Sequence, residues 1–565
     1  MLSTKTVKKN IEHVGTLAER AVKMELGKYK VSWTTDHWTG KDGKTYQTIT
    51  CHYIDDDWKL RRCMIDFKVF SGSTTGERIY EDCKEVFEKY NLALDQIKLG
   101  VTDTTANMGK FGQYLHENDL DHAYCADHVL HCNGSEAFED KNIPGADGAM
   151  AKARKIIEFF SKSTQASAKL LEFQMLSTFG AYGEENYCPK KLLQDVITRW
   201  WSTYRMLKRL RICKPALIGL VASGVIKLDL PSDDQWTVLH QIEIVLKMMA
   251  TWQRLLEGDK YPTGSLLVMA IYQIRKHYVG VLNSSETAAP VKRLTEILLK
   301  DFDECRYTPE LGHEGKVRFS RKVVTGKRKR YVTAHPYMFI AAFLDPRCRK
   351  GLEKAWMIPE QYEDLRDLVL DLMIDVAKET NSNTTDNAGD DGSGGEAQGG
   401  SKAGESCFAF SGAFDFNDDD AANETSTEER IRIRCEAQLV AYERSDGLPM
   451  QDAENNFIDP LKHWKKTAHH FPELAKLAQE FLSIPATSAP SERIWSRAAR
   501  VITAKRSCID PTVTSSIMFV QENSNLIHEH WNDLMPDTSL NEYLLPPPFR
   551  DIDEDGNLID AGGDE

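Results

Sequence analysis

The chain has 565 residues, and a single hydrophobic core rarely serves so many, so its length predicts roughly three to four domains of about 150 residues. The N-terminus is basic but has no apolar run behind it, which excludes an ordinary secretory signal. The longest apolar-leaning stretch, Pro215 to Ile226, is shorter than the roughly 18 residues that cross a bilayer. We therefore expect an intracellular chain without a membrane partner.

The net charge of −14 is unevenly distributed along the chain. Residues 381–429 hold 12 acidic residues against one lysine, and residues 551–565 hold seven acidic residues and no basic one. Together these segments carry −18, which leaves +4 for the rest of the chain. The part that is expected to fold can therefore approach phosphate groups.

The 12 cysteines are scattered and form no CxxC pair. This spacing argues against a disulfide framework and against a ribbon-type zinc site. We expect reduced, mostly buried cysteines and no zinc site.

The N-terminal third predicts an α/β arrangement. Residues 31–36, 47–54 and 59–70 are rich in β-branched and aromatic residues and are separated by Gly and Asp turns, so they predict three strands. A helical pattern from Gly76 to Tyr90 precedes an apolar strand that starts at Ile97 and leads to Asp103, and another helix is expected near Ala106. This order of elements matches a ribonuclease-H-like fold.

The middle of the chain predicts amphipathic helices, among them 236–256 and 265–281. A basic run, 316–330, ends in Lys327, Arg328, Lys329 and Arg330. It could be a solvated loop, a ribbon that contacts phosphate, or a nuclear-import signal. Residues rich in Gly, Ser, Asn and Asp then predict a disordered acidic linker, and further helices are expected at 431–444 and through most of 457–527.

These patterns divide the chain into six segments. They are a short helical segment (1–30), the first part of an α/β core (31–145), an all-helical domain (146–379), the acidic linker (380–429), a helical region that completes the core (430–535) and an acidic tail (536–565).

Two aspartates end predicted strands, Asp36 and Asp103. If these strands are neighbours, both carboxylates emerge at one edge of the sheet, as a pair of hard divalent cations would require. An aspartate at a strand end is more often a turn former or a helix cap. Likewise, Thr487 and Ser488 predict the start of a helix. Considered without its surroundings, Glu492 would be an acidic residue in the first turn of that helix, where the helix dipole favours a negative charge.

The sequence around these residues resembles the hAT superfamily of DNA transposases. TTDHWTGKDGKTYQTITCHYID and VTDTTANMGKF resemble its first two catalytic blocks, and FPELAKLAQEFLSIPATSAPSERIWSRAARVITAKRS resembles its C-terminal dimerisation region. The resemblance implies a ribonuclease-H-like core interrupted by a large helical insertion. It also implies that Asp36, Asp103 and Glu492 are catalytic ligands of Mg²⁺ or Mn²⁺, that DNA is the substrate, that the chain self-associates, and that it acts in the nucleus.

Other blocks carry the same resemblance. DVITRWWSTYRMLKRL resembles a segment whose Arg-Trp pair lies close to the cleaved DNA, which would give that role to Arg199 and Trp200; a helix anchor in the core is the alternative for the tryptophans. YCADHVLHC supplies a Cys-x-x-His, Cys125 and His128, that would lie near the DNA, although a buried structural histidine is equally compatible. In this motif the family usually has alanine and asparagine where this chain has Asp127 and His131. AAFLDPRCRK resembles a structural segment.

The residues before Val31 depart from the family pattern. Members usually carry a BED-type zinc finger there, whereas this stretch has no CxxC and no paired histidines. We therefore expect the finger to be missing. Two functions remain open, a transposase that cleaves DNA with metal and a non-catalytic descendant that dimerises and acts as an interaction or regulatory protein.

Overall fold

A mixed five-stranded sheet forms the centre of the N-terminal part of the chain. The computed structural model describes residues 4–139, 143, 145–176, 188–196, 200–303, 335–386, 427–454, 457–503 and 509–534. The sheet order is β3-β2-β1-β4-β5, with β1, β2 and β3 antiparallel and β1, β4 and β5 parallel. The strands are β1 (Val31–Thr39), β2 (Thr45–Ile54), β3 (Leu60–Val69), β4 (Ile97–Thr102) and β5 (Asp121–Tyr124).

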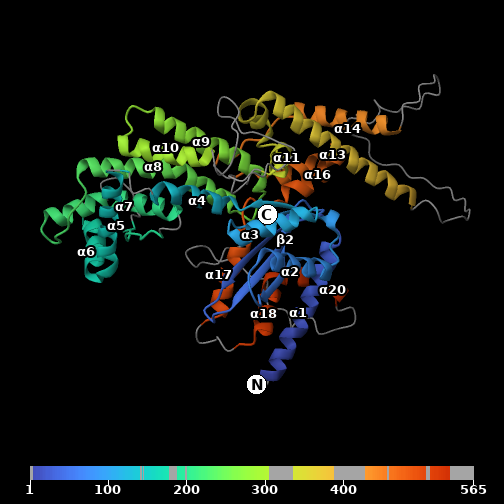
Figure 1. Ribbon diagram of the computed structural model, residues 1–565, viewed down its shortest axis with the longest axis horizontal. Helices are drawn as coiled ribbons and strands as arrows, with labels where there is room; N and C mark the ends of the chain where they lie inside the picture. Colours follow the sequence, from blue (N-terminus) through green and yellow to red (C-terminus); the bar gives the residue numbers. More distant parts are fainter. Residues whose placement is uncertain are drawn as a thin grey trace, which may run out of the picture.

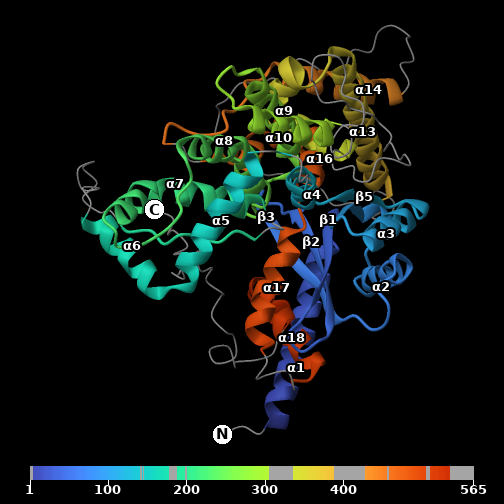
Figure 2. The same ribbon diagram turned by 60° about the vertical axis from the view of Figure 1, so that its left-hand side comes forward.

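Helices from both ends of the chain pack around this sheet (Figures 1 and 2). Those from the N-terminal part are α1 (Thr4–Leu26), α2 (Gly76–Lys89), α3 (Ala106–Glu117) and α4 (Ala126–Glu139). Those from the C-terminal part are α17 (Ala489–Val501), α18 (Pro511–Glu522), α19 (Ser524–Glu529) and α20 (Trp531–Leu534).

The two faces of β1 are occupied by different layers, because side chains alternate along a strand. Trp33 lies edge-on to Phe87 of α2, with 5.1 Å between the ring centroids. Thr34 points to the opposite face, where its hydroxyl lies 2.8 Å from that of Ser491 on α17. Asp36 shares the face of Thr34, so the strand directs its carboxylate toward the C-terminal helix.

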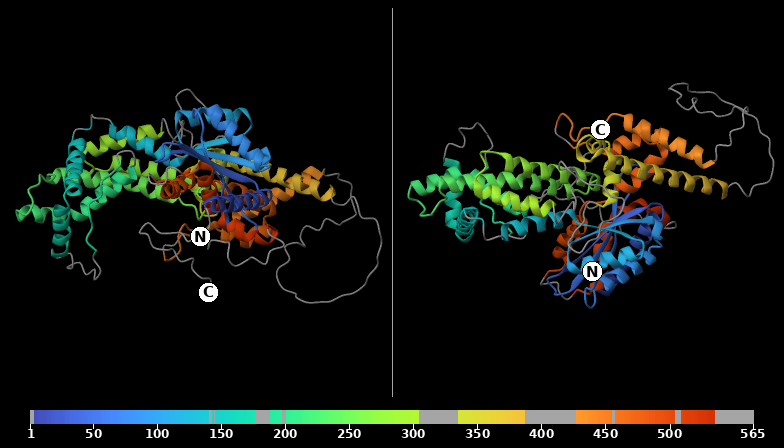
Figure 3. Two further views of the ribbon diagram at one scale, coloured as in Figure 1. Left: turned by 90° about the horizontal axis from the view of Figure 1, so that it is seen from below. Right: turned by 45° about the horizontal axis from the view of Figure 1, so that its top comes forward.

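The remaining helices form a second, all-helical part beside the sheet (Figure 3). An extended arm contains α5 (Ala146–Lys162), α6 (Thr164–Leu176), α7 (Trp200–Ala222), α8 (Asp233–Leu256), α9 (Leu267–Asn283) and α10 (Ala289–Asp301). Nearer the sheet lie α11 (Pro336–Leu344), α12 (Arg349–Gly351), α13 (Pro359–Asp386), α14 (Thr427–Arg444), α15 (Pro460–Thr467) and α16 (Pro472–Leu482).

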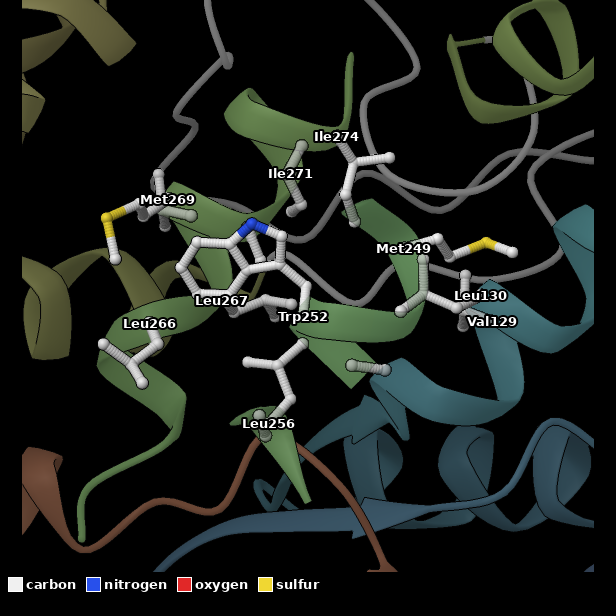
Figure 4. Packing of buried hydrophobic residues seen from close by; sticks show 14 of the residues in the cluster. Val129, Leu130, Met249, Trp252, Leu256, Leu266, Leu267, Met269, Ile271 and Ile274 are labelled. Carbon is white, nitrogen blue, oxygen red and sulfur yellow. The ribbon is translucent and has the colours of Figure 1, made fainter. Parts of the chain in front are cut away.

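A continuous apolar core joins the arm to the α/β part. Trp252 and Leu256 at the end of α8 belong to the same buried cluster as Val129 and Leu130 of α4 (Figure 4). Since α4 directly follows β5, this packing fixes the end of α8 close to the edge of the sheet. Among the helices of the described residues, none is both long enough and apolar enough to cross a membrane.

The AAFLDPRCRK segment is built around a buried ion pair. Arg347 lies 2.6 Å from the Asp345 carboxylate, and both side chains are fully buried. Ser265 donates a further hydrogen bond to Asp345 over 2.7 Å. Such a pair needs its hydrogen-bond partners in place, so this segment holds the helices around it in one arrangement.

Most predicted elements are confirmed. The three antiparallel strands, the helix beginning at Gly76, the strand from Ile97 and the helix near Ala106 all form. Strand β5 was missed because it has only four residues, two of them charged or ionisable, and so has no recognisable apolar pattern. The linker proposed for 380–429 lies outside the described residues between 387 and 426, and α13 extends to Asp386.

The outermost strand, β3, is paired on its free side by one side chain. The Asn523 amide donates to the Met64 carbonyl over 2.8 Å and accepts from the Met64 N–H over 3.0 Å. Asn523 is buried, at 1% exposure. This single amide therefore replaces the hydrogen bonds of a neighbouring strand and ties the C-terminal helices to the sheet.

We predict that Asn523→Leu lowers the free energy of unfolding by about 2–4 kcal/mol, because it leaves a buried N–H and a buried carbonyl without partners. Asn118→Ala is the matched control, since the Asn118 amide bonds to a carbonyl at an exposed helix end; its effect should stay below about 0.5 kcal/mol. Chemical denaturation measures both. Equal effects for the two variants would contradict the role of Asn523.

Candidate functional site

Asp36 is a buried carboxylate held by two N–H donors. Its Oδ1 accepts from the His37 backbone N–H over 2.8 Å, and its Oδ2 accepts from the Trp495 indole N–H over 3.2 Å. Trp495 in turn stacks on Trp38, with 5.8 Å between ring centroids. The carboxylate is thus oriented both by the next residue and by a residue 459 positions away in the chain.

Asp103 directly follows β4, the strand that neighbours β1. Thr34 pairs with Val101 in the parallel register of β1 and β4, so Asp36 and Asp103 follow at equivalent positions. Asp103 Oδ1 accepts from the N–H and the hydroxyl of Thr105 over 3.0 and 2.9 Å, in the turn that opens α3. Asp103 is therefore both a turn former and a neighbour of Asp36.

Glu492 lies in the first turn of α17, one residue after Ser491. A chain of hydroxyl contacts anchors this turn to the sheet, from Ser491 to Thr34 (2.8 Å) and from Thr34 to Thr50 (2.7 Å). As predicted from Thr487 and Ser488, the helix starts here, with Ser488 as its N-cap residue. These contacts fix the backbone position of Glu492 relative to β1 and β2.

The three acidic residues interact electrostatically. Burial, followed by the negative charges of Asp103 and Glu492, raises the pKa of Asp36 to about 7. Within the described residues, no three His, Cys, Asp or Glu side chains are close enough to form a finished metal cage. Asp36 is thus close enough to Asp103 and Glu492 to interact with them electrostatically, but among the described residues the three carboxylates are not arranged as a metal site.

Cys125, the first residue of the Cys-x-x-His motif that ends at His128, contacts the residue that caps α17. Cys125 is fully buried, and its sulfur accepts from the Ser488 N–H over 3.3 Å. The N–H of Ala126 donates to the Ala486 carbonyl over 3.0 Å. The start of the Cys-x-x-His motif therefore contacts the loop that leads to Glu492. The charge of His128 acts on Asp36, lowering its pKa against the larger raising effects.

Two acidic residues of the site were not singled out from the sequence, Asp127 and Glu257. Burial, followed by the charge of Glu257, raises the pKa of Asp127 well above its usual value, and burial likewise raises the pKa of Glu257. The Glu492 charge acts on both residues. Arg493 donates to the Glu257 carbonyl. The only sequence signal was that Asp127 replaces an alanine of the family pattern.

Several predicted site residues cannot be placed. Arg199, Lys327, Arg328, Lys329 and Arg330 lie outside the described residues. Trp200 is the first residue of α7, but its side chain lies outside the described part of the structure.

Comparison with protein families matches three parts of the chain. Residues 34–134 match the ZBED1 RNase-like domain and residues 125–245 match the ZBED1 RNase-like helical domain. Residues 441–524 match the hAT family C-terminal dimerisation region. The matched segments contain Asp36, Asp103 and Glu492, the acidic residues that the fold brings together.

Similar proteins come from plants and animals. The chain is 22% identical over 511 residues to the putative AC transposase of Zea mays, an alignment that covers 87% of this chain and 56% of that protein. It is 23% identical over 480 residues to zinc finger BED domain-containing protein 4 of Homo sapiens, covering 82% of this chain and 35% of that protein.

The putative AC9 transposase of Zea mays is 28% identical over 205 residues, which cover 34% of this chain and 23% of that protein. The chain thus spans less than two thirds of the length of each of these relatives. The RNase-like segment comes first in the chain and the dimerisation region comes last. In the structure the two are in contact, because α17 of the dimerisation region packs onto the sheet of the RNase-like segment. The chain therefore carries the hAT family C-terminal dimerisation region behind the ZBED1 RNase-like and RNase-like helical domains, and its relatives include putative transposases of Zea mays.

Proposed function

We propose that this chain cleaves and joins DNA strands with the help of divalent cations, as a hAT-type transposase. The observation that carries the proposal is that Asp36 and Asp103 occupy adjacent positions in the register of β1 and β4, and that the charge of Glu492, from the far end of the chain, also acts on Asp36. The sheet order, with three antiparallel strands followed by two parallel ones, supports a ribonuclease-H-like core. The C-terminal match supports self-association through residues 441–524.

The chemistry of the three carboxylates fits Mg²⁺ or Mn²⁺. They offer hard oxygen ligands. Burial, and after it the charges of Asp103 and Glu492, raises the pKa of Asp36, and a bound cation would relieve this cost of ionisation. When bound, the cation supplies charge stabilisation at the phosphoryl group and activates the attacking oxygen. Asp36, Asp103 and Glu492 would hold it.

Side-chain and backbone groups of the chain orient these carboxylates. The indole N–H of Trp495 and the backbone N–H of His37 fix the direction of the Asp36 carboxylate. Thr105 does the same for Asp103. His128 lies beside Asp36 and would face the scissile phosphate, while Cys125 positions the loop before Glu492.

Other parts of the proposal concern DNA and location. We assign Arg199 and Trp200 to the cleaved end, as a phosphate contact and a stacking surface for an extruded base. The basic run would contact phosphate through Lys327, Arg328, Lys329 and Arg330. A DNA-cleaving protein of this kind would act in the nucleus.

A second function is a non-catalytic protein that dimerises and associates with DNA as a regulator. The observation in its favour is that some of the chain's relatives do not have the name of a transposase, among them zinc finger BED domain-containing protein 4 of Homo sapiens. Metal-dependent nicking of DNA by the wild type and by Glu492→Gln separates the two functions.

We expect the purified chain to nick supercoiled plasmid DNA in the presence of Mg²⁺ or Mn²⁺ and not in EDTA. Glu492→Gln keeps the side-chain volume but removes one charged ligand, so the rate should fall by at least about 100-fold. Glu436→Gln, on an exposed face of α14, is the control and should match the wild type. If the wild type gives no metal-dependent nicking, or if Glu492→Gln nicks equally well, the regulatory function is favoured.

As the pH rises from about 4 to about 7, ionisation of Asp36 should lower the free energy of unfolding of the metal-free protein. Folded Asp36 has a pKa of about 7 against 3.8 for the free side chain, so the folded state binds the extra proton and the cost of ionisation is complete above pH 7. The cost reaches up to about 4 kcal/mol.

Thermal unfolding in EDTA at several pH values, for the wild type and Asp36→Asn, measures this effect. The difference between the two isolates Asp36 from other titrating groups, such as His37, whose pKa burial lowers to about 4. Adding Mn²⁺ at pH 8 should raise the melting temperature of the wild type alone. Parallel pH profiles, or an equal shift of both proteins by Mn²⁺, would contradict the assignment of Asp36 as a ligand.

A further inference from the structure

Helix α7 carries an unusual excess of positive charge. Its 23 residues include five arginines and lysines and no acidic residue. Two of the cations lie over aromatic rings one turn away, Arg205 over Trp201 (5.2 Å to the ring centroid) and Lys208 over Tyr204 (5.9 Å). Arg205 and Lys208 are exposed, so these rings support cations that face solvent.

Two further lysines are fixed beside this face. Arg209 donates to the Lys191 carbonyl over 2.7 Å, and the Cys213 thiol lies 3.5 Å from the Lys190 carbonyl. Both lysine side chains are exposed. We call the set of Lys190, Lys191, Arg205, Lys208 and Arg209 the basic ridge.

The basic ridge is not neutralised by the part of the protein that the structure describes. Neighbouring cations are paired, since Arg211 lies 2.7 Å from Glu243 and Arg154 lies 2.9 Å from Asp195. By contrast, no ion pair within the described residues involves a member of the ridge. Five like charges on one surface repel one another, and a polyanion would remove that cost.

The ridge lies at the end of the arm that approaches the carboxylates. Arg211 faces Glu243 and Lys214 faces Trp236, so α7 and α8 run antiparallel, and the two helices lie side by side in Figures 1 and 2. The last residue of α8, Leu256, immediately precedes Glu257, which the Glu492 charge affects.

This register places the N-terminal turns of α7 beside the C-terminal half of α8, the end that leads to Glu257. At about 1.5 Å per residue, Arg205 lies roughly 10 Å along the helix axis from the end of α8. The whole of α7 is about 35 Å long, close to one turn of duplex DNA. DNA that leaves the carboxylates along α7 would therefore meet the ridge first.

We propose that the basic ridge binds the sugar-phosphate backbone of duplex DNA next to the cleavage position, without reading its sequence. This assignment rests on the proposed function for the choice of DNA as the partner. Arginine and lysine neutralise phosphates and release counterions, and such contacts set the register of the duplex rather than specificity. Trp201 and Tyr204 support the side chains of Arg205 and Lys208, which would extend toward the DNA backbone.

The test measures binding of a fluorescent 40-base-pair duplex by anisotropy in EDTA, at several salt concentrations. We expect Arg205→Ala/Lys208→Ala to weaken binding at least about tenfold at 0.1 M salt and to reduce the slope of log K against log salt by about 2. The matched control is Lys276→Ala/Lys300→Ala, because Lys276 also lies over a ring one turn away, Tyr272, at 5.8 Å.

Each outcome decides the proposal. It is overturned if the ridge variant keeps the wild-type salt slope, if both double variants lose affinity equally, or if the ridge variant loses binding to a polyglutamate peptide while its affinity for DNA is unchanged. Thermal unfolding checks that all variants are folded, and Arg205→Lys/Lys208→Arg should restore binding.

Failure of the proposed function gives a different pattern. In that case the wild type still binds DNA with ridge-dependent affinity but does not nick it with metal. If the ridge assignment alone is wrong, nicking remains sensitive to Glu492→Gln while both double variants bind like the wild type.

Discussion

A carboxylate buried among other carboxylates is the constraint around which this structure is organised. Asp36 is kept in place by an indole N–H from Trp495 and by its neighbour's backbone N–H, while burial and two adjacent negative charges oppose its ionisation. Such a residue is stable only if the surrounding structure fixes it. The contacts that bring α17 to β1 do so, from the Ser491 hydroxyl to the stack of Trp495 on Trp38.

The site also depends on the helical part of the protein. The C-terminal part of α8 packs on α4, where Met249 lies beside Val129 and Leu130 (Figure 4), and Glu257 after α8 interacts electrostatically with Asp127 of α4. A change in the position of the arm would therefore reach the acidic residues through α8. Because α7 runs antiparallel to α8, the same contact relates the basic ridge to the carboxylates.

Much of the fold could be predicted from the sequence, because alternating β-branched residues and Gly or Asp turns mark β1 to β3. The end of β4 marks Asp103, whereas Asp36, which was expected to end a strand, lies inside β1 because that strand continues to Thr39. The convergence of Glu492 with them came from a resemblance, since no local pattern relates residues so far apart. The Trp495 contact with Asp36 and the Asp127 pair with Glu257 could not be predicted, because they arise only when separate elements pack together.

The central claim is that three acidic residues from distant segments form one cation site. Titration of the metal-free protein with Mn²⁺, followed by electron paramagnetic resonance of the free ion, tests it directly. The account predicts saturable binding that Asp36→Asn, Asp103→Asn and Glu492→Gln each weaken by at least about tenfold, while Glu436→Gln binds like the wild type. Binding that is unchanged in all three variants, or no binding by the wild type, would contradict it.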